Sequence, residues 1–460
     1  MNILILGAGQ VGTTAAHHLA REEGNEVTIV DSDAGVLREL QDRLDVRTVV
    51  GHASHPAVLA RAGAREADMI IALTSSDEIN MVACQIAYTL FQTKTKIARI
   101  RAAEYIAAEE LWQQAAIPVD FLISPEELVT KHIEQLIQYP GAFQVLEFAE
   151  GAVRLVGARA LANGLLVGQQ IKTLSEHIPG VETRIAAIYR DGHSIVPDGD
   201  TTIMENDDVF FIAARKDIRV VMSEMRKLDA PVRKVVIAGG GNIGFRLASA
   251  LEQTNQVKII ERSKTRAKEI SERLGKTIVL HGDAADEELL LEENIDSADI
   301  FVALTNSEEA NILSAMVAKQ LGCNKVMSLI NRKAYADIVE SATIDVAISP
   351  RQITIGSLLA HVRRGDVVKV HSLRGGRAEA LEAVAHGSKE ESRVVGRSIE
   401  DIKLPQGASI SAIVRQGAVM QAHHDTVVET DDHIIMFITD RRQTDEVERL
   451  FQVTVEFNDK

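Results

Sequence analysis

The sequence is poor in several residue types that mark common protein classes. Its 460 residues include only two cysteines, Cys84 and Cys323. Two thiols cannot form a disulfide framework or a four-cysteine zinc site, and this scarcity fits a reducing compartment. Aromatic residues make up 4%, with Trp112 the single tryptophan, so stacking sites of the carbohydrate-binding kind are not expected. No apolar run approaches the roughly 18 residues that a membrane-spanning helix needs.

The chain also lacks an excess of basic residues. Its 50 basic and 66 acidic side chains give a net charge of −16. Neither nucleic acid nor an anionic lipid surface is therefore expected to supply its main affinity. Residues 1–6 run straight into glycines with no basic leader, so no signal peptide is predicted. The remaining composition, 46% hydrophobic and 25% charged, is typical of a soluble cytoplasmic protein with complete cores.

What the sequence does contain is an internal repeat. A glycine-rich motif at residues 7–12 recurs 232 positions later (239 − 7) at residues 239–244. The segment 74–80 recurs as 305–311, at an offset of 231. Because order and spacing are both preserved, the sequence predicts a tandem duplication of a unit of about half the chain.

Each half divides into two parts with different hydrophobic patterns. In the first part, short continuous apolar runs alternate with helix-like stretches, which is typical of a parallel sheet covered on both faces. The second part carries alternating strands with turn signals at Asp191-Gly192 and Gln416-Gly417. The predicted fold class is therefore α/β, with two Rossmann-like doubly wound parallel-sheet domains, each followed by a small α+β C-terminal module.

The boundaries follow from the repeat and from helix-start signals. Ser124-Pro125 and Ser349-Pro350 each place a serine cap and a proline at the start of a helix. The predicted parts are a first Rossmann-like nucleotide-binding domain at 1–124, a connecting helix at 125–140, a first C-terminal module at 141–226, a second Rossmann-like nucleotide-binding domain at 232–349, a connecting helix at 350–364 and a second C-terminal module at 365–460.

Both glycine-rich motifs stand where a dinucleotide-binding loop belongs, after a five-residue apolar strand and before a helix. The first glycine allows a tight turn, the second lets a pyrophosphate approach the backbone, and the third lets helix and strand pack closely. The pyrophosphate would then meet the free N–H groups of the helix. The predicted cofactor-binding residues of the loops are Gly7, Ala8, Gly9, Gln10, Val11 and Gly12, and Gly239, Gly240, Gly241, Asn242, Ile243 and Gly244.

An acidic residue ends the second strand of each half. Asp31 follows Gly12 by 19 residues, and Glu261 follows Gly244 by 17. A carboxylate here can accept the ribose hydroxyls and would repel a 2′-phosphate. The flank of Asp31 has no basic residue, which favours NAD(H) or an adenine nucleotide over NADP, whereas Arg262 makes this preference less secure in the second half. The alternative interpretation is a doubly wound fold that has lost its ligand.

Polar residues also follow the third and fifth strands, where such sheets bind ligands. His52 and, at the equivalent position, Asp283 are placed to flank an adenine. Arg99 and Arg101 on the fifth strand could meet phosphates or form exposed salt bridges. Leu329 replaces Arg99 in the second half. The two sites are therefore not expected to bind identical ligands equally well.

The fourth strand of each half is followed by a hydroxyl-bearing residue. The pairs are Thr74-Ser75 and Thr305-Asn306. These four residues could reach a phosphate or a ribose, or they could only cap the helix that follows.

Catalytic motifs are hard to find. The sequence has no HExxH, no GxSxG and no Walker lysine. His52 and His55 lack a third ligand nearby, and the segment 423–425 (His-His-Asp) has no histidine in its counterpart at 197–200, so no metal is expected. Cys84 and Cys323 are interpreted as small packed residues and not as nucleophiles.

Enzymatic and structural alternatives remain open. A soluble NAD-dependent oxidoreductase would need an acid–base residue and a substrate pocket beside the nicotinamide. The small modules, however, repeat at the ends of both halves, as regulatory modules do, whereas a substrate domain would more usually appear once. A third hypothesis is a structural scaffold whose nucleotide sites are vestigial.

The order of these motifs resembles the RCK/KTN family. The resemblance rests on the loop at 7–12, Asp31, Gly51-His52-Ala53, and the segments 74–80 and 98–101, followed by a small β-rich module. It covers essentially the full chain, in which the unit of the family is present as two consecutive copies. His52 departs from the Gly-Asp-Ala form that residues 282–284 keep, and Leu329 departs from Arg99 in the same way.

The resemblance implies a regulatory gating protein and not an enzyme. It implies units that bind NAD(H) and, in some members, ATP or ADP, with the glycine loops, Asp31 and Glu261 at the cofactor positions. It also implies self-association into a ring on the cytoplasmic face of a membrane-embedded potassium-transporting subunit. The protein is then expected to be peripheral on the inner face of the bacterial cell membrane, without a nucleic-acid partner.

Overall fold

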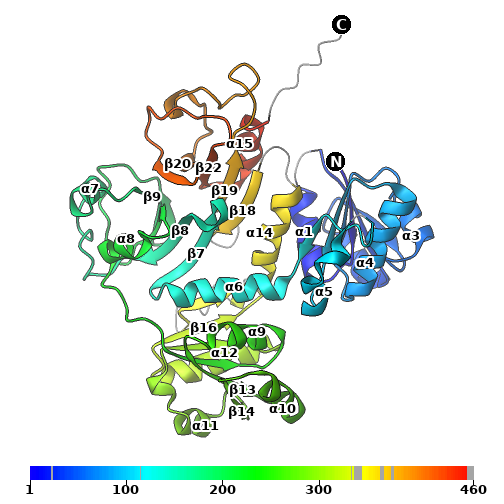
Figure 1. Ribbon diagram of the computed structural model, residues 1–460, viewed down its shortest axis with the longest axis horizontal. Coiled ribbons are helices and arrows are strands. Elements are labelled where there is room, and N and C mark those ends of the chain that lie inside the picture. The colour runs from blue at the N-terminus through cyan, green and yellow to red at the C-terminus, as the bar shows by residue number, and fades with distance from the viewer. Residues whose placement is uncertain are drawn as a thin grey trace. The chain divides into compact units, whose positions relative to one another are not determined.

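The computed structural model describes residues 1–21, 24–113, 115–332, 334–335, 344–362, 367–373 and 378–452 (Figure 1). These residues form two parallel and two antiparallel sheets. The chain separates into two compact units, Met1–Leu128 with Pro350–His361, and Val129–Ser349 with Val362–Lys460.

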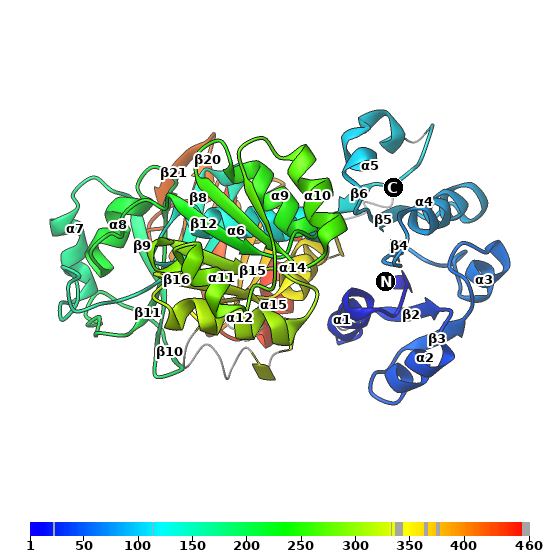
Figure 2. The same ribbon diagram turned by 90° about the horizontal axis from the view of Figure 1, so that it is seen from below.

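The first six-stranded sheet is wholly parallel and has the order β3-β2-β1-β4-β5-β6. Its strands are β1 (Asn2–Leu6), β2 (Glu26–Asp31), β3 (Arg47–Val50), β4 (Met69–Ala72), β5 (Thr95–Arg99) and β6 (Phe121–Ile123). The helices between them are α1 (Gln10–Leu19), α2 (Ala34–Gln41), α3 (Pro56–Arg61), α4 (Asp77–Ile86) and α5 (Ala103–Ala107). In Figure 2, α1 and α2 lie on one side of this sheet, and α3 and α4 lie on the other.

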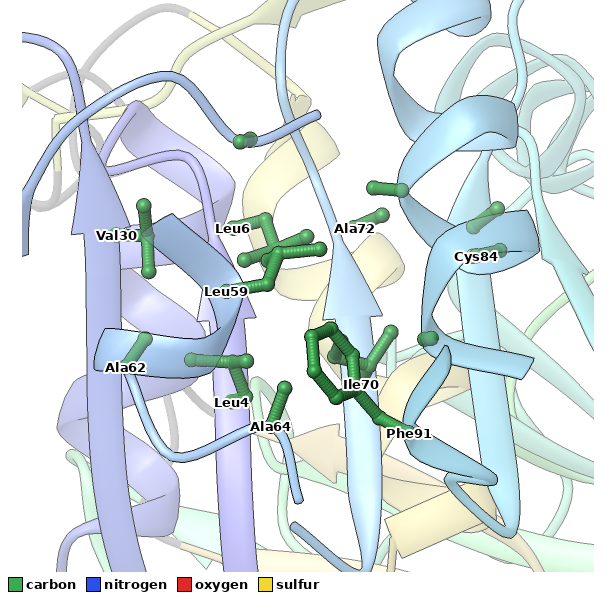
Figure 3. Close-up of a cluster of buried hydrophobic side chains, with 14 of the residues drawn as sticks. Leu4, Leu6, Val30, Leu59, Ala62, Ala64, Ile70, Ala72, Cys84 and Phe91 are labelled. Carbon is green, nitrogen blue, oxygen red and sulfur yellow. The ribbon is translucent and has the colours of Figure 1, made fainter. Parts of the chain in front are cut away.

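The strands are continuously apolar because both faces of the sheet are covered. Side chains alternate between the faces, so Leu4 and Leu6 of β1 point to the side of α3 and α4. There they pack with Leu59 of α3 and Cys84 of α4 in one buried cluster (Figure 3). The predicted interpretation of Cys84 as a packed helix residue agrees with this position, since burial raises the pKa of its thiol to about 12.

The second parallel sheet has the equivalent order, β14-β13-β12-β15-β16-β17. Its strands are β12 (Lys234–Ala238), β13 (Gln256–Glu261), β14 (Ile278–His281), β15 (Ile300–Ala303), β16 (Lys325–Leu329) and β17 (Val346–Ile348). The helices between them include α9 (Asn242–Leu251), α10 (Lys264–Arg273), α11 (Glu287–Glu292) and α12 (Glu308–Gln320). The same topology in both halves confirms the predicted duplication of a Rossmann-like fold.

The two antiparallel sheets are also copies of one another, with orders β10-β9-β11-β8-β7 and β21-β20-β22-β19-β18. The first contains β7 (Ala142–Phe148), β8 (Val153–Arg159), β9 (Thr183–Arg190), β10 (His193–Ile195) and β11 (Asp208–Ala214), with α7 (Leu174–His177) and α8 (Ile218–Met225). The second contains β18 (Val367–Leu373), β19 (Ala378–Val384), β20 (Ala408–Arg415), β21 (Ala418–Gln421) and β22 (His433–Ile438), with α15 (Thr444–Leu450).

The predicted hairpin turns of these modules are confirmed. Asp191 and Gly192 have φ of 50° and 79°, and Gln416 and Gly417 have φ of 50° and 78°. Two consecutive residues with positive φ are characteristic of the tight turn that joins two antiparallel strands.

The two modules share one core within the second unit. Phe148 and Phe210 of the first module pack in the same buried cluster as Phe437 of the second. Arg184 of β9 donates from Nη1 to the carbonyl oxygens of Ile410 and Ala422, at 3.0 and 2.9 Å. A cation thus ties the backbone of one module to that of the other.

The connecting helices are α6 (Pro125–Gln138) and α14 (Pro350–Val362). Although α14 follows the second parallel sheet in the chain, it belongs to the same compact unit as the first one. The ring of His361 on α14 stacks on the ring of Phe121 on β6, with centroids 4.0 Å apart. The order of elements along the chain did not predict that α14 would pack in the unit of the first sheet.

Candidate nucleotide sites

The first glycine loop joins β1 to α1, and two of its glycines are required by backbone geometry. Gly7 has a φ of +102°, and a Cβ at this position would lie 2.9 Å from the carbonyl oxygen of Leu73. A Cβ at Gly12 would lie only 1.9 Å from the carbonyl oxygen of Gly7. Around Gly9, by contrast, a Cβ would meet nothing within 4 Å. The outer glycines therefore shape the loop, and the middle one leaves open space in front of it.

The second glycine loop joins β12 to α9 and repeats this geometry closely. Gly239 has a φ of +103°, and a Cβ at Gly244 would lie 2.0 Å from the carbonyl oxygen of Gly239. Gly241 again has nothing within 4 Å of a Cβ. Both loops thus have the cradle that a pyrophosphate would fill.

The helices that follow the loops begin without a side-chain cap. Gly9 and Gly241 are the N-caps of α1 and α9, and neither first turn contains an acidic residue. Caps from Asp33, Ser76 and Ser263 satisfy the starts of α2, α4 and α10 instead. The N–H groups at the starts of α1 and α9 are thus available to an anion, which the helix dipole also favours.

The acidic residue at the end of the second strand is fixed beside each loop. Asp31 accepts the N–H groups of Ala8 and Asp33, at 2.6 and 2.8 Å. Its counterpart Glu261 accepts the N–H groups of Gly240 and Ser263, both at 2.7 Å. A carboxylate has about four lone-pair sites, so each still has acceptor capacity for a ribose hydroxyl.

The side chains of Ile270 and Glu261 crowd the position at which the second loop contains one more glycine. A Cβ at Gly240 would lie 2.5 Å from Cδ1 of Ile270 and 3.2 Å from Oε2 of Glu261. The shorter Asp31 stands beside Ala8 in the first half. The loop residue and the carboxylate beside it are therefore both different in the second site, where Gly240 and Glu261 replace Ala8 and Asp31.

Thr74 and Thr305 lie after β4 and β15, beside the glycine loops. A Cβ on Gly7 would lie 3.0 Å from Cα of Thr74, and one on Gly239 would lie 3.1 Å from Cα of Thr305. Of the two roles predicted for these pairs, that of a cap for the next helix is not formed, because the caps of α4 and α12 are Ser76 and Ser307. The partners of the pairs, Ser75 and Asn306, are exposed.

Sequence reasoning missed the asparagine that holds each threonine. Asn80, fully buried, accepts the N–H and the hydroxyl of Thr74 at 3.0 and 2.7 Å and donates to the carbonyl oxygen of Arg99 at 2.9 Å. Asn311 binds Thr305 and the carbonyl oxygen of Leu329 in the same way. The signal was present in the repeated segments 74–80 and 305–311, which both end in asparagine.

A second missed pair ties the same helix to the end of the fifth strand. Asp77 at the start of α4 accepts the N–H groups of Arg101 and Ala102, at 2.9 and 2.8 Å. Glu308 at the start of α12 accepts the N–H groups of Asn331 and Arg332. The loops after the fourth and fifth strands are therefore joined in both halves.

The two arginines of the first half converge on a glutamate in the first turn of α6. Arg101 Nε donates to Glu126 Oε1 at 2.7 Å, and Arg99 Nη2 lies 3.9 Å from the same oxygen. Burial lowers the pKa of Arg99. Its Nε atom is buried without a hydrogen-bond partner among the described residues. Of the two predicted roles, the ion pair is the one formed here, and a buried donor remains beside it.

His52 and Asp283 lie in the loops after β3 and β14, and both are exposed. His52 Nδ1 is 2.9 Å from Ser54 Oγ, and its ring is 4.8 Å from that of His55. Asp283 accepts the N–H of Ala285 at 2.9 Å. Across the described part of the chain, no group of three potential metal ligands comes together.

The parts of each site meet at the carboxyl ends of the parallel strands. In both sheets the strand order reverses between the first and fourth strands, β1 and β4 or β12 and β15. This reversal is where doubly wound sheets bind their ligands. The glycine loop, the acidic residue and the threonine loop surround that point in each half.

Comparison with known proteins identifies the family of the chain. The model of the TrkA-N domain matches residues 3–125 and 235–350, and the model of the TrkA-C domain matches residues 155–226 and 389–452. A "Trk system potassium uptake protein TrkA" of Halomonas elongata is 58% identical over 99% of this chain and 100% of its own length. The protein of the same name from Vibrio alginolyticus is 57% identical over 98% of this chain and 99% of its own length.

Solved structures show the same fold. The "GsuK channel bound to NAD" has a TM-score of 0.61 to this chain at 17% identity, over 98% of this chain and 78% of the channel chain. The chain belongs to the TrkA family of potassium uptake proteins, with the family's two domains present in tandem. It is a regulatory potassium uptake subunit and not an enzyme.

Proposed function

We propose that this chain binds NAD(H) at the two glycine loops, with ATP or ADP as competing ligands, and thereby gates potassium transport through a membrane-embedded partner. One observation carries the proposal. Each half presents an uncapped helix start, an open cradle at Gly9 or Gly241, and a carboxylate clamped beside the loop. A dinucleotide needs these three features together. The GsuK channel, which shares this fold and was solved bound to NAD, supports the same class of ligand.

The proposed contacts divide the ligand among the loops. The loop residues 7–12 and 239–244 would hold the pyrophosphate, and Asp31 and Glu261 would hold the ribose. The nucleotide would be bordered by Thr74, Ser75, Thr305 and Asn306, together with His52 and Asp283. Arg99 would offer its partly buried guanidinium to a phosphate. The predicted domain boundaries, 1–124, 125–140, 141–226, 232–349, 350–364 and 365–460, form part of the same proposal.

The mechanism is a linked equilibrium. A ligand shifts a conformational equilibrium only if it binds one conformation more tightly than the other. The same coupling makes the transporter's state alter nucleotide affinity. The loops suit this role because the backbone is closely packed at Gly7 and Gly12. In addition, hydrogen bonds to Asn80 and Asp77 connect the loops that follow the fourth and fifth strands. A bound nucleotide would thus act on a connected set of loops.

The proposed partner is a potassium-transporting membrane subunit of the TrkH or TrkG type, reached by a ring of copies of this chain on the inner face of the cell membrane. Among the described residues, no helix is both long and apolar enough to cross a bilayer. With a net charge of −16, the chain would meet such a partner by specific contacts and not by attraction to anionic lipid. The same charge disfavours nucleic acid as a partner.

Isothermal titration of the full-length chain with NADH, NAD and ATP tests the binding step. We expect saturable binding to the unchanged chain, and about tenfold weaker binding at the first site alone after Asp31→Ala, since hydrogen bonds to a charged group are lost there. Gly199→Ala is a suitable control, because a Cβ there would meet only the Cβ of Lys172, at 3.6 Å. Absence of binding by NADH, NAD and ATP alike would overturn the proposal.

A further inference from the structure

The two nucleotide sites differ in charge beside the ribose carboxylate. After Asp31, residues 32–36 include one further acid, Asp33, and no basic residue. After Glu261, the equivalent residues 262–266 include three basic side chains, Arg262, Lys264 and Arg266. Two nearly identical backbones therefore present opposite charge at the same place.

One of these cations is held against the glycine loop. In the first half, the Thr13 hydroxyl donates to the carbonyl oxygen of Ala8 at 2.9 Å. In the second half, Arg266 Nε donates to the equivalent carbonyl, that of Gly240, at 2.8 Å. Phe245 stands in the place of Thr13, and the Arg266 guanidinium lies 6.0 Å from the centroid of its ring. A neutral hydroxyl has thus been replaced by a guanidinium.

Arg266 and Glu261 bind the two polar groups of a single loop residue. The N–H of Gly240 donates to Glu261 Oε2 at 2.7 Å, while its carbonyl accepts from Arg266. Nη1 of Arg266 also contacts Glu269 at 2.7 Å. A guanidinium has five N–H donors, so further donors remain for a ligand. Arg262, next to Glu261 in the chain, is exposed.

We propose that the second site accepts a nucleotide with a phosphate on the 2′-oxygen of its adenosine ribose, of which NADPH is the type, and that the first site excludes it. The proposal rests on the proposed function, since it names the ligand class of one of the two sites. Arginine matches the geometry of phosphate oxygens and binds them by paired hydrogen bonds. In dinucleotide-binding folds, a nearby arginine accommodates the 2′-phosphate that a lone carboxylate would repel.

Glu261 does not oppose this assignment. Both of its oxygens already accept backbone N–H groups, which offsets part of its charge. It can still accept the ribose hydroxyl of NADH, so the second site takes both forms. Asp31 accepts two backbone N–H groups in the same way, but residues 32–36 of the first site supply no cation to bind a 2′-phosphate.

The test uses full-length chains in which one site at a time is blocked. Gly9→Ala or Gly241→Ala puts a methyl group into the open cradle without meeting any atom within 4 Å. Titration of the Gly9→Ala chain reports on the second site, and titration of the Gly241→Ala chain reports on the first. NADH and NADPH are the probes, at two salt concentrations, because the additional charge of NADPH strengthens nonspecific attraction at low salt.

We expect NADPH to bind the Gly9→Ala chain at least about tenfold more tightly than the Gly241→Ala chain, the ratio that a charged hydrogen-bond pair supplies. Equal NADPH affinities, with NADH binding retained by both chains, would overturn the inference and leave the proposed function standing. Failure of both chains to bind NADH and NADPH, while the unchanged chain also fails, would overturn the proposed function and this inference together.

Exchange of side chains between the sites sharpens the test. In the Gly9→Ala background, Arg262→Ser and Arg266→Val introduce the residues of the first half, Ser32 and Val36. NADPH affinity should then fall about tenfold while NADH affinity changes by less than about threefold. Lys268→Ser on the same helix is the matched control, because it removes one exposed cation that pairs with Glu272. An equal loss of NADPH affinity in this control would show a nonspecific charge effect and overturn the assignment.

Discussion

The two nucleotide sites of this chain share a backbone and differ in the side chains around it. Gly7 and Gly239 have φ values of +102° and +103°, and the carboxylates of Asp31 and Glu261 accept equivalent N–H groups. Yet the loop carbonyl is held by a threonine in one half and by Arg266 in the other. The comparison teaches that the means of holding a pyrophosphate has been kept after duplication, while the residues that select the rest of the ligand have diverged.

The largest expected effect concerns the part that the sites share. Gly12→Ala and Gly244→Ala should each destabilise their domain by about 3 kcal/mol or more, because the new Cβ would lie 1.9 or 2.0 Å from a carbonyl oxygen. Urea denaturation followed by circular dichroism measures this loss.

Gly9→Ala and Gly241→Ala are the controls for that experiment, since their Cβ atoms meet nothing within 4 Å. These two variants should unfold within about 1 kcal/mol of the unchanged chain, since alanine is a poorer N-cap than glycine. If Gly12→Ala were equally well tolerated, the loop would not have the tight geometry on which both sites depend.

A smaller loss of stability, equal in the two halves, is expected when the buried asparagines are replaced. Asn80→Ala and Asn311→Ala each leave the threonine loop without its partner, at a cost of about 2–3 kcal/mol for the unsatisfied groups. Because Thr74 and Thr305 are held in the same way, the two losses should agree to within about 0.5 kcal/mol. The free energy of unfolding of the two variants checks this. A clear inequality would mean that the frame around the sites has also diverged.

The smallest expected effect is a pH dependence of stability that comes from a buried histidine of the second module, which the first module lacks. His371 on β18 is replaced at the equivalent position of β7 by Leu146. Its ring meets Phe148 edge to face, its Nε2 lies 3.4 Å from the carbonyl oxygen of Glu147, and burial lowers its pKa to about 4. Burial also lowers the pKa of His132 to about 4. The folded chain therefore binds fewer protons than the unfolded chain between about pH 4 and 6.5.

Stability should accordingly be complete above about pH 6.5 and decrease as the pH falls toward 4. His371→Leu should remove about 2 kcal/mol of the loss between pH 7 and 5, as measured by denaturant titration at each pH. His193→Gln, at an exposed position of β10, is the control and should leave the pH dependence unchanged. An identical acid response in His371→Leu and the unchanged chain would contradict a role for this buried ring.

Much of the fold was predictable because short segments of the sequence show the hydrophobic pattern or the turn residues of the structure they form. Continuous apolar strands and helical periodicity predicted both parallel sheets, and the repeated Asp-Gly and Gln-Gly turns predicted hairpins in the modules. The glycine loops could be predicted from their spacing together with the strand and helix that flank them, because the outer glycines are required by the backbone geometry and the middle one leaves open space. The membership of α14 in the unit of the first sheet could not be read in this way, since nothing in its own sequence specifies a distant partner.

The candidate site was less completely predictable. Asn80 and Asp77 act through hydrogen bonds to backbone groups 19 and 24 residues away, and only the structure brings those groups together. Contact with a phosphate and salt bridges are the two predicted roles of Arg99 and Arg101, and their salt-bridge partner, Glu126, lies in another element that local patterns do not connect to them. The contact of Arg266 with Gly240 spans 26 residues, so no local sequence pattern indicates it.

Potassium flux through the reconstituted membrane subunit, with the full-length chain and NADH added from the cytoplasmic side, tests the central claim most directly. We expect NADH to change the flux with the unchanged chain and with Gly199→Ala. The double variant Gly9→Ala with Gly241→Ala should bind the membrane subunit but no longer respond to NADH. A double variant that responded to NADH like the unchanged chain would contradict the claim that these two loops sense the nucleotide.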